Sequence, residues 1–199
     1  MQAQIPEVKA AVHLLNRQMT VTTGNRNFLD HVDVVSPNFF RIIQLPLVAG
    51  DRATLFAQPE SAVITESMAK KYFGDAPALG KMLRVGPVCE FGPEPELQGT
   101  CVTRQADVLV TGVARDLPHN TQLTGDVFIP NTSAADPMSP GEKQKWLDNN
   151  GYGYVELAPG VNLPQVVKKV AALIDRSVDL DELTAAGRRA AAANPFPRQ

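Results

Sequence analysis

Two pairs of ionisable side chains are spaced closely enough to suggest acid–base chemistry. His31 and Asp33 stand two positions apart in the alternating segment HVDVV, which would place both on one face of a strand. Glu94 and Glu96 alternate with prolines, and paired carboxylates can exchange protons with a substrate. No GxSxG elbow or other framed nucleophile accompanies either pair. Both pairs are therefore interpreted as solvated surface groups, and a small hydrolase that uses them is the weakest functional hypothesis.

The two cysteines, Cys89 and Cys101, bracket a segment with two prolines and two glycines. Thiols that flank a turn-rich excursion could face each other across a hairpin. A disulfide there would close a loop of about a dozen residues and stabilise the fold by roughly 3 kcal/mol, provided that the compartment is oxidising. The alternative is two unrelated thiols in a reducing compartment. A zinc site is poorly supported, because no CxxC or HExxH spacing occurs and the three histidines are scattered.

Charge and motifs exclude several further classes of protein. The net charge is −2, so no basic field exists to hold a nucleic acid backbone. Neither GxGxxG nor GxxxxGK[ST] occurs, which leaves no signal for a nucleotide site, and we expect no cofactor in this chain. The longest apolar runs fall far short of the roughly 20 residues of a membrane helix, and no signal peptide is evident. The chain as given is expected to be soluble, although it could be a fragment of a membrane protein.

Hydrophobic periodicity predicts two strands at the start of the chain, over 8–23 and 31–35, although the first run could also be a helix through Arg17. Ser36 is expected to cap a short helix that has Pro37 at its first position. Phe39 and Phe40 would dock this helix on the core.

Further along, the run SAVITE predicts a buried strand. Thr65 is expected to cap the helix that follows, and Gly74 to end it. Strands are also expected in KMLRV, ADVLVTGVARD with a bulge at Gly112, GDVFIP and GYGYVELAPG. A helix should start near Asn162 and carry one apolar side formed by Val166, Val167, Val170, Leu173 and Ile174. A second, Ala-rich helix is expected over 180–193, and a short one over 142–147.

Strands and helices that alternate irregularly, with several hairpins, indicate an α+β fold with mixed or antiparallel sheets and short helices. Two lobes are expected over residues 1–199, with insertions at 87–103 and 131–150. Loops commonly carry function, so two connections are candidate contact surfaces. The first, over 117–123, contains Pro118, His119 and Asn120. The second contains Trp146, which is interpreted as packing locally, with a partner anchor as the alternative.

Four segments in a fixed order carry a resemblance: VSPNFFRIIQLPLVAGD, SAVITESMAKKYFGDAPALGKMLRV, ADVLVTGVARDLPHNTQLTGDVFIP and YVELAPGVNLPQVVKKVAALI. Together they resemble the periplasmic core domain of MacB/FtsX-type ABC transporter permeases over roughly residues 30–175. The motif residues are Val35, Pro37, Phe39, Phe40, Gly50, Asp51, Phe73, Gly74, Asp75, Pro77, Gly80, Lys81, Val110, Gly112, Val113 and Asp116. Two features depart from the family pattern: the excursion between the cysteines is longer than usual, and Asp51 stands where arginine is common.

The resemblance implies a domain without catalytic residues that lies between two membrane helices, on the periplasmic face of the bacterial inner membrane. Its partners would be its own membrane helices, a cytoplasmic ATPase, and a periplasmic adaptor or substrate, with a dimer expected in the full transporter. The domain would pass ATP-driven motion to a substrate or partner in the export of peptides, drugs or lipoproteins. The alternative is a free-standing periplasmic domain for ligand binding or protein interaction.

Overall fold

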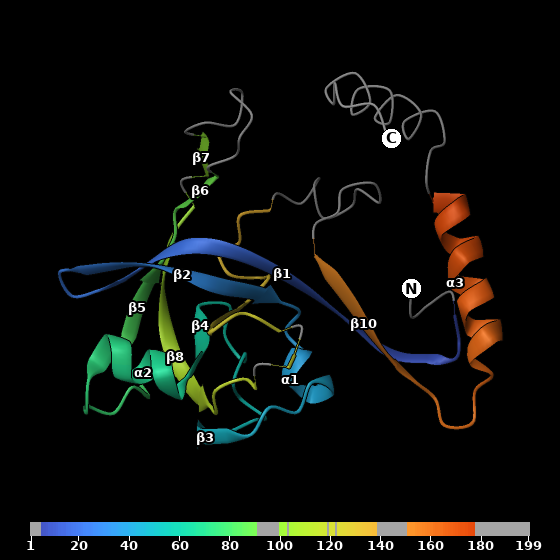
Figure 1. The fold of residues 1–199 in the computed structure, drawn as a ribbon, viewed down its shortest axis with the longest axis horizontal. Helices are drawn as coiled ribbons and strands as arrows, with labels where there is room; N and C mark the ends of the chain where they lie inside the picture. Colours follow the sequence, from blue (N-terminus) through green and yellow to red (C-terminus); the bar gives the residue numbers. More distant parts are fainter. Residues whose placement is uncertain are drawn as a thin grey trace. The chain divides into compact units, whose positions relative to one another are not determined.

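The computed structural model describes residues 5–90, 100–102, 104–118, 120–121, 123–138 and 151–177, without the side chains of 88–90, 100–102 and 175–177 (Figure 1). The chain divides into two compact units. Unit 1 consists of residues 1–11, 140–150 and 155–199, and unit 2 of residues 12–139 and 151–154. Strands β1 and β10 each begin in one unit and end in the other.

Six strands of unit 2 pair in a closed cycle, which we call the strand ring. Its members follow the order β1–β2–β9–β4–β8–β5, and β5 pairs with β1 to close it. The β2–β9 and β4–β8 pairs are parallel and the others antiparallel. The strands are β1 (Val8–Thr23), β2 (Arg26–Val35), β4 (Ser61–Thr65), β5 (Met82–Val85), β8 (Ala106–Ala114) and β9 (Val127–Pro130).

Two further strands extend the sheet, and one hairpin is separate from it. β3 (Leu47–Gly50) pairs with β8, and β10 (Tyr152–Leu157) neighbours β1. The long β1–β2 hairpin, blue in Figure 1, supplies two neighbouring strands of the ring, which pair from Leu14 opposite Val35 to Thr23 opposite Arg26. β6 (Val88–Glu90) and β7 (Thr100–Val102) form a separate two-stranded hairpin.

Both faces of the central strands are covered by apolar side chains. One face forms the first cluster, which contains Met19, Val32, Ile64, Leu83 and Val108 among others. The opposite face forms the second cluster: Val12, Leu14, Val35, Phe39, Phe40, Leu55, Val63, Ala114 and Phe128. Because successive side chains of a strand point to opposite faces, two-sided coverage buries every residue of β4 and β9. This explains why their sequences are continuous apolar runs without alternation.

Helix α2 (Glu66–Phe73) forms where the local signals predict it. Met68 N–H donates to the Thr65 hydroxyl over 3.4 Å, which caps the first turn. Gly74 ends the helix at a φ of 65°, a conformation that favours glycine. The predicted apolar face, including Met68, Tyr72 and Phe73, packs on the first cluster.

The prediction for helix α1 (Phe39–Ile42) is right for its aromatic residues and wrong for its start. Phe39 and Phe40 are buried, but the residue at the N-cap position is Asn38, which makes no capping bond. Ser36 instead accepts a 2.8 Å hydrogen bond from the His13 backbone N–H. The contact with β1, 23 positions away, outcompetes the local capping role, and Pro37 falls in a turn before the helix.

Unit 1 is organised around helix α3 (Leu163–Ser177). The helix starts beside Asn162, as expected, and Asn162 accepts a hydrogen bond from Gln165 N–H over 3.3 Å, which caps the first turn. The apolar side is narrower than expected. On α3, Val166 and Leu173 are buried and Val170 is partly buried. They pack against Ile5 and Val8, which precede and begin β1. Val167 and Ile174, predicted to share this side, are 58% and 42% exposed. Each follows a buried residue, Val166 or Leu173, and therefore lies about 100° around the helix axis from it.

The fold class is confirmed as α+β, with a mixed sheet of eight strands in the described residues. The segment 8–23 is a strand, so its helical alternative is wrong. The prediction of two lobes with two insertions stays a prediction. The helices expected over 142–147 and 180–193 lie outside the described residues.

Candidate functional site

Helix α2 is tied to its surroundings by two carboxylates distant in sequence. Asp116, which follows β8, accepts a 2.9 Å hydrogen bond from Ser67 N–H and a 2.7 Å bond from the Ser67 hydroxyl. Partial burial acts to raise the pKa of Asp116, but hydrogen bonds from the side chain and backbone of Ser67 and from the Thr65 side chain together lower it. A carboxylate at this end of a helix also complements the helix dipole. Asp116, the last of the motif residues, therefore stabilises the start of α2.

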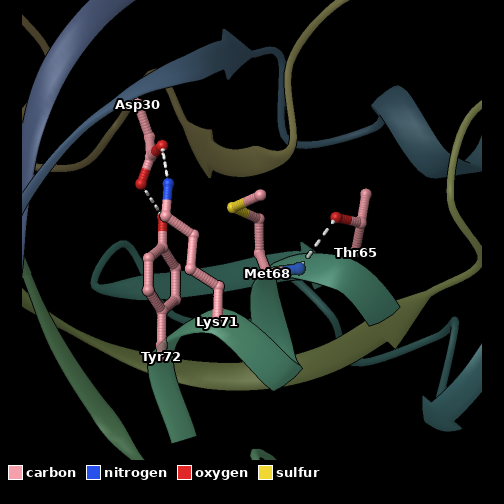
Figure 2. A network of polar contacts seen from close by, with 5 residues as sticks. All are labelled: Asp30, Thr65, Met68, Lys71 and Tyr72. Carbon is pink, nitrogen blue, oxygen red and sulfur yellow. Dashed lines mark hydrogen bonds and ion pairs between the residues drawn. The ribbon is translucent and has the colours of Figure 1, made fainter. Parts of the chain in front are cut away.

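The second tie lies on the other side of α2, where Asp30 of β2 meets Lys71 and Tyr72 (Figure 2). The Tyr72 hydroxyl donates to Asp30 Oδ2 over 2.6 Å, and Lys71 Nζ forms an ion pair with Oδ1. Asp30 is only 8% exposed, so its charge is compensated where solvent is scarce. Burial raises the pKa of Tyr72, and the hydrogen bond to Asp30 raises it further. Lys71 stays exposed to solvent while its ammonium group reaches Asp30 on β2.

Two motif glycines allow a close approach between β3 and β8. Gly50 is paired with Gly112, and its φ is +97°. A Cβ on Gly50 would lie 2.5 Å from the Thr111 carbonyl oxygen, and one on Gly112 would lie 2.4 Å from Leu55 Cδ2. The β4–β8 register shifts here, with Ala62 opposite Val110 and Val63 opposite Gly112. The predicted bulge is thus present, centred on Thr111.

The two motif phenylalanines are part of an aromatic group with Phe128 and Phe56. The ring centroids of Phe39 and Phe40 lie 5.3 Å apart, and both lie within 6 Å of the Phe128 centroid, at 5.9 and 5.5 Å. Phe40 is 3% exposed and Phe39 is fully covered. Rings at these distances and tilts add to the stabilisation from burial alone. These rings therefore fill the second cluster and line no open groove.

The first chemical pair, His31 and Asp33, does share one side of β2, but only His31 is solvated. Asp33 is fully buried, which corrects the interpretation of both residues as surface groups. Asn16 Nδ2 donates to Asp33 Oδ1 over 2.6 Å, and Gly125 N–H donates to Oδ2 over 3.2 Å. Burial raises the pKa of Asp33 to about 6. The second cluster and the segment before β9 cover this face, which sequence alternation alone could not reveal.

The cysteines face each other at the level of the backbone. Cys89 of β6 is paired with Cys101 of β7 across an antiparallel hairpin. Residues directly opposite in such a pair have Cα atoms about 4.5–5.5 Å apart, which a disulfide can span. Their side chains, and Glu94 and Glu96, lie outside the described part, so the disulfide stays a prediction.

The candidate contact connections are described in part. Pro118 and Asn120 are exposed, whereas His119 and Trp146 lie outside the described residues. A second surface feature, not singled out from the sequence, is a shallow hollow of about 280 Å³ beside β5. Arg84 and Asp107 form a two-bond ion pair in it at 2.7 and 3.1 Å, and Met82 lines it with half of its surface exposed. Among the described residues, no group of acidic residues, histidines and cysteines could hold a metal ion.

A family model described as the MacB-like periplasmic core domain matches residues 1–173 of the chain. The chain belongs to this family. Domains of the family are parts of ABC transporter permeases, so the chain is an extracytoplasmic domain of a MacB-like permease. No curated protein matches the sequence.

Solved structures agree with the MacB-like fold. A domain of a Porphyromonas gingivalis protein described as a permease is 26% identical, with a TM-score of 0.64 over 94% of this chain and 71% of that one. The extracellular domain of the transporter YknZ from Gram-positive bacteria is 16% identical, with a TM-score of 0.56 over 86% and 77%. The periplasmic region of MacB from Actinobacillus actinomycetemcomitans is 14% identical, with a TM-score of 0.54 over 92% and 77%.

In the described part of this MacB-like domain, no helix is long and apolar enough to cross a membrane. The individual motif residues, from Val35 to Asp116, fall in unit 2, whereas the fourth segment of the resemblance, over 154–174, falls mostly in unit 1. Several of the motif residues lie in the aromatic group, at Gly50 and Gly112, and at the ends of α2. Their role as a family framework stays a prediction.

Proposed function

We propose that this MacB-like domain transmits motion, driven by ATP hydrolysis in a cytoplasmic subunit or domain, to a substrate or partner protein outside the membrane. The proposal assigns the domain no catalytic step and no cofactor. The exported substrate would be a peptide, a drug or a lipoprotein, and a periplasmic adaptor and a second permease copy are the expected protein partners. Family membership supports this function over that of a free-standing binding domain.

The division of the chain into units is the observation that carries the proposal. Residues 1–11 and 155–199 belong to unit 1, so membrane helices joined to either side of this domain would act on unit 1. The motif residues and the strand ring belong to unit 2. Because β1 and β10 run without interruption from one unit into the other, motion that enters unit 1 would reach unit 2 along two strands.

Distance measurements in the full-length permease, reconstituted with its ATPase, test the proposal. Spin labels would replace exposed Lys168 on α3 and Lys70 on α2, one in each unit, with Cys89 and Cys101 changed to serine. We expect the distance distribution between the labels to shift between the nucleotide-free and the ATP–vanadate-trapped transporter.

A control pair within unit 2 separates transmission from general loosening. Labels at Lys70 and at exposed Val48 on β3 should keep one distance in both states. An unchanged Lys70–Lys168 distance in a transporter that hydrolyses ATP would contradict the proposed transmission. A shift of both pairs would instead indicate that unit 2 deforms and does not move as one body.

A further inference from the structure

One part of the strand ring has a face that the second cluster does not cover. Leu83 on β5 and Val108 on β8 belong to the first cluster, so the residues next to them in each strand point to the opposite face. On neighbouring strands the second cluster covers that face. Among the described residues, this cluster includes none from β5 and only Ala114 from β8. The opposite face of β5 and of the start of β8 is therefore in contact with solvent.

Four side chains make up this surface, which we call the open face: Met82, Arg84, Asp107 and Leu109. Met82 and Leu109 are 52% and 40% exposed, and the side chains of Arg84 and Asp107 are about half exposed. The antiparallel pairing of β5 and β8 (Figure 1) places Met82 directly opposite Leu109, and Arg84 directly opposite Asp107. The open face thus consists of one apolar row and one charged row, two positions apart along the strands.

The backbone under the open face is fixed by hydrogen bonds on both sides of β8. Gly80 N–H donates to the Val110 carbonyl, and Val110 N–H donates to the Lys81 carbonyl, each over 2.8 Å. On the other side, Leu109 N–H donates to the Glu60 carbonyl over 3.0 Å. A surface carried by paired strands is already ordered, so a partner that binds it loses little affinity to backbone ordering.

The charged row can form a second set of hydrogen bonds. Arg84 Nε and Nη2 donate to the two carboxylate oxygens of Asp107 at 2.7 and 3.1 Å. These bonds lower the pKa of Asp107 and raise the pKa of Arg84, so both groups are charged at neutral pH. A guanidinium has further N–H donors, and a carboxylate has further lone pairs. Each group can therefore bond to a copy of the other while it keeps its present partner.

The apolar row lies beside the hollow next to β5. The hollow, of about 280 Å³, is lined by Met82, Leu83 and the charged row, together with Thr22 and Gly24 of the β1–β2 hairpin. Leu109 is exposed on the neighbouring strand and is not among the residues that line the hollow. The open face therefore carries both an exposed leucine and a hollow with an apolar wall that such a side chain could enter.

The register of the two rows matches one two-fold arrangement of two copies. In a two-fold contact, if residue i meets residue j, then j also meets i. With the axis parallel to β5 and β8 and midway between them, each residue of the open face meets the residue type directly opposite it. Arg84 of each copy then faces Asp107 of the other, and Met82 faces Leu109. With the axis across the strands, the charged row would face the apolar row, which would desolvate the charges without compensation.

We propose that the open face is a contact surface for a second copy of this domain, related by a two-fold axis that runs between β5 and β8. The contact joins four charges of alternating sign in one network, and networks stabilise more than isolated exposed ion pairs. It also removes Met82 and Leu109 from water. A partner with charge of one sign would repel either Arg84 or Asp107, whereas a second copy matches both. The inference specifies the second copy that the proposed function expects, and it rests on that proposal only for its place in the transporter.

Self-association of the purified 199-residue chain tests the contact without an ATPase or a membrane, so a negative result would leave the proposed transmission of motion untouched. Because small interfaces are weak, we expect sedimentation equilibrium to give a dimer with a dissociation constant on the order of 10⁻⁴ M. A non-reducing gel excludes dimers linked through Cys89 or Cys101. In NMR spectra, the amide signals of β5 and of the start of β8 should shift with concentration, whereas those of α1 should not. A chain that stays monomeric at about 1 mM, or shifts confined to other elements, would overturn the proposal.

Exchange of the two charges assigns the association to the charged row. Arg84→Glu alone places four like charges together and should weaken the dimer at least about tenfold. Arg84→Glu combined with Asp107→Arg restores opposite charges within each copy and between the copies. This double exchange should return the dissociation constant to within about threefold of the native value. Thermal unfolding checks that both variants are folded. A dimer that survives Arg84→Glu, or that the double exchange does not restore, would contradict the two-fold arrangement.

A substitution in the apolar row tests the contact without changing the ion pair. Met82→Lys places a charge opposite Leu109 of the second copy and should also weaken the dimer at least about tenfold. Leu29→Lys is the matched control, because it makes the same change in net charge. Leu29 is 58% exposed on β2, which is separated from β5 by β1, and its substitution should leave the association unchanged. Equal weakening by the two variants would show that the open face is not the contact.

Discussion

The two compact units bury apolar side chains in different ways. In unit 2, apolar side chains cover both faces of the strand ring, with one cluster on each side. Each strand of the ring also forms backbone hydrogen bonds with a neighbour on both sides, because the cycle is closed. In the described part of unit 1, one face of α3 packs against a short segment that contains Ile5 and Val8. Truncating a core side chain of unit 2 should therefore cost more stability than truncating one of unit 1, because more neighbouring side chains lose contacts.

The largest expected effect is in the second cluster of unit 2. Phe40→Ala should destabilise the domain by about 3–5 kcal/mol, because a buried ring in contact with three others leaves a cavity. Denaturant unfolding measures this change, with Val48→Ala as the exposed control in the same unit. An unchanged midpoint for Phe40→Ala would mean that this ring is free to bind something else.

The β6–β7 hairpin extends the comparison to a two-stranded sheet that is separate from the strand ring. We expect Cys89 and Cys101 to be oxidised in protein exported from the cytoplasm, and the bridge to contribute roughly 3 kcal/mol. Counting free thiols in the denatured, unreduced protein checks this. Two free thiols would refute the bridge and leave the hairpin with its backbone pairing.

Unit 1 should respond locally to a change in its small core. Leu173→Ala is expected to cost about 2–3 kcal/mol, the low end for such truncations, because the rim of a small cluster can collapse. Amide exchange should accelerate in α3 while protection in the strand ring stays the same. Val167→Ala, on the exposed side of the same helix, is the matched control. Equal acceleration in the ring would show that the two units unfold together.

The smallest expected effect concerns the tie between β8 and α2. Asp116→Ala should cost about 1 kcal/mol at neutral pH, as the loss of a helix cap does. The pKa of Asp116 is lowered, so its contribution is present above the ordinary carboxyl range and disappears as the pH falls through its folded pKa. Unfolding should therefore give a larger difference at pH 7 than at pH 3, whereas Asp75→Ala, after the end of the same helix, should give little at either pH.

Much of unit 2 follows from local sequence signals. The α2 segment carries its own cap, apolar face and stop in Thr65, Tyr72 and Gly74, and it forms as predicted. The strand over 8–23 and the bulge beside Gly112 also carry local signals, in alternation and in a glycine. The order of four motifs then identified the family, which periodicity alone could not do.

The predictions that failed depend on contacts between distant segments. Ser36 is a residue type that commonly caps helices, but its hydroxyl accepts a hydrogen bond from the backbone N–H of His13 on β1. Asp33 alternates as a surface residue would, yet Phe128 and Gly125, about 90 positions later, cover that face. Nothing near Asp116 in the sequence indicates that it reaches Ser67, 49 positions away. The motif supplies the aspartate, and only the parallel β4–β8 pairing explains its position.

The long excursion between β5 and β8 has a consequence for how this domain can diversify. Val85 and Ala106 are directly opposite each other in the strand ring, so the chain leaves and returns at adjacent points. A loop whose ends are already together costs only about 0.6 kcal/mol for each doubling of its length. This position is therefore where evolution could lengthen the domain freely, and where an engineer could insert an affinity tag or a fluorescent reporter without disturbing the ring.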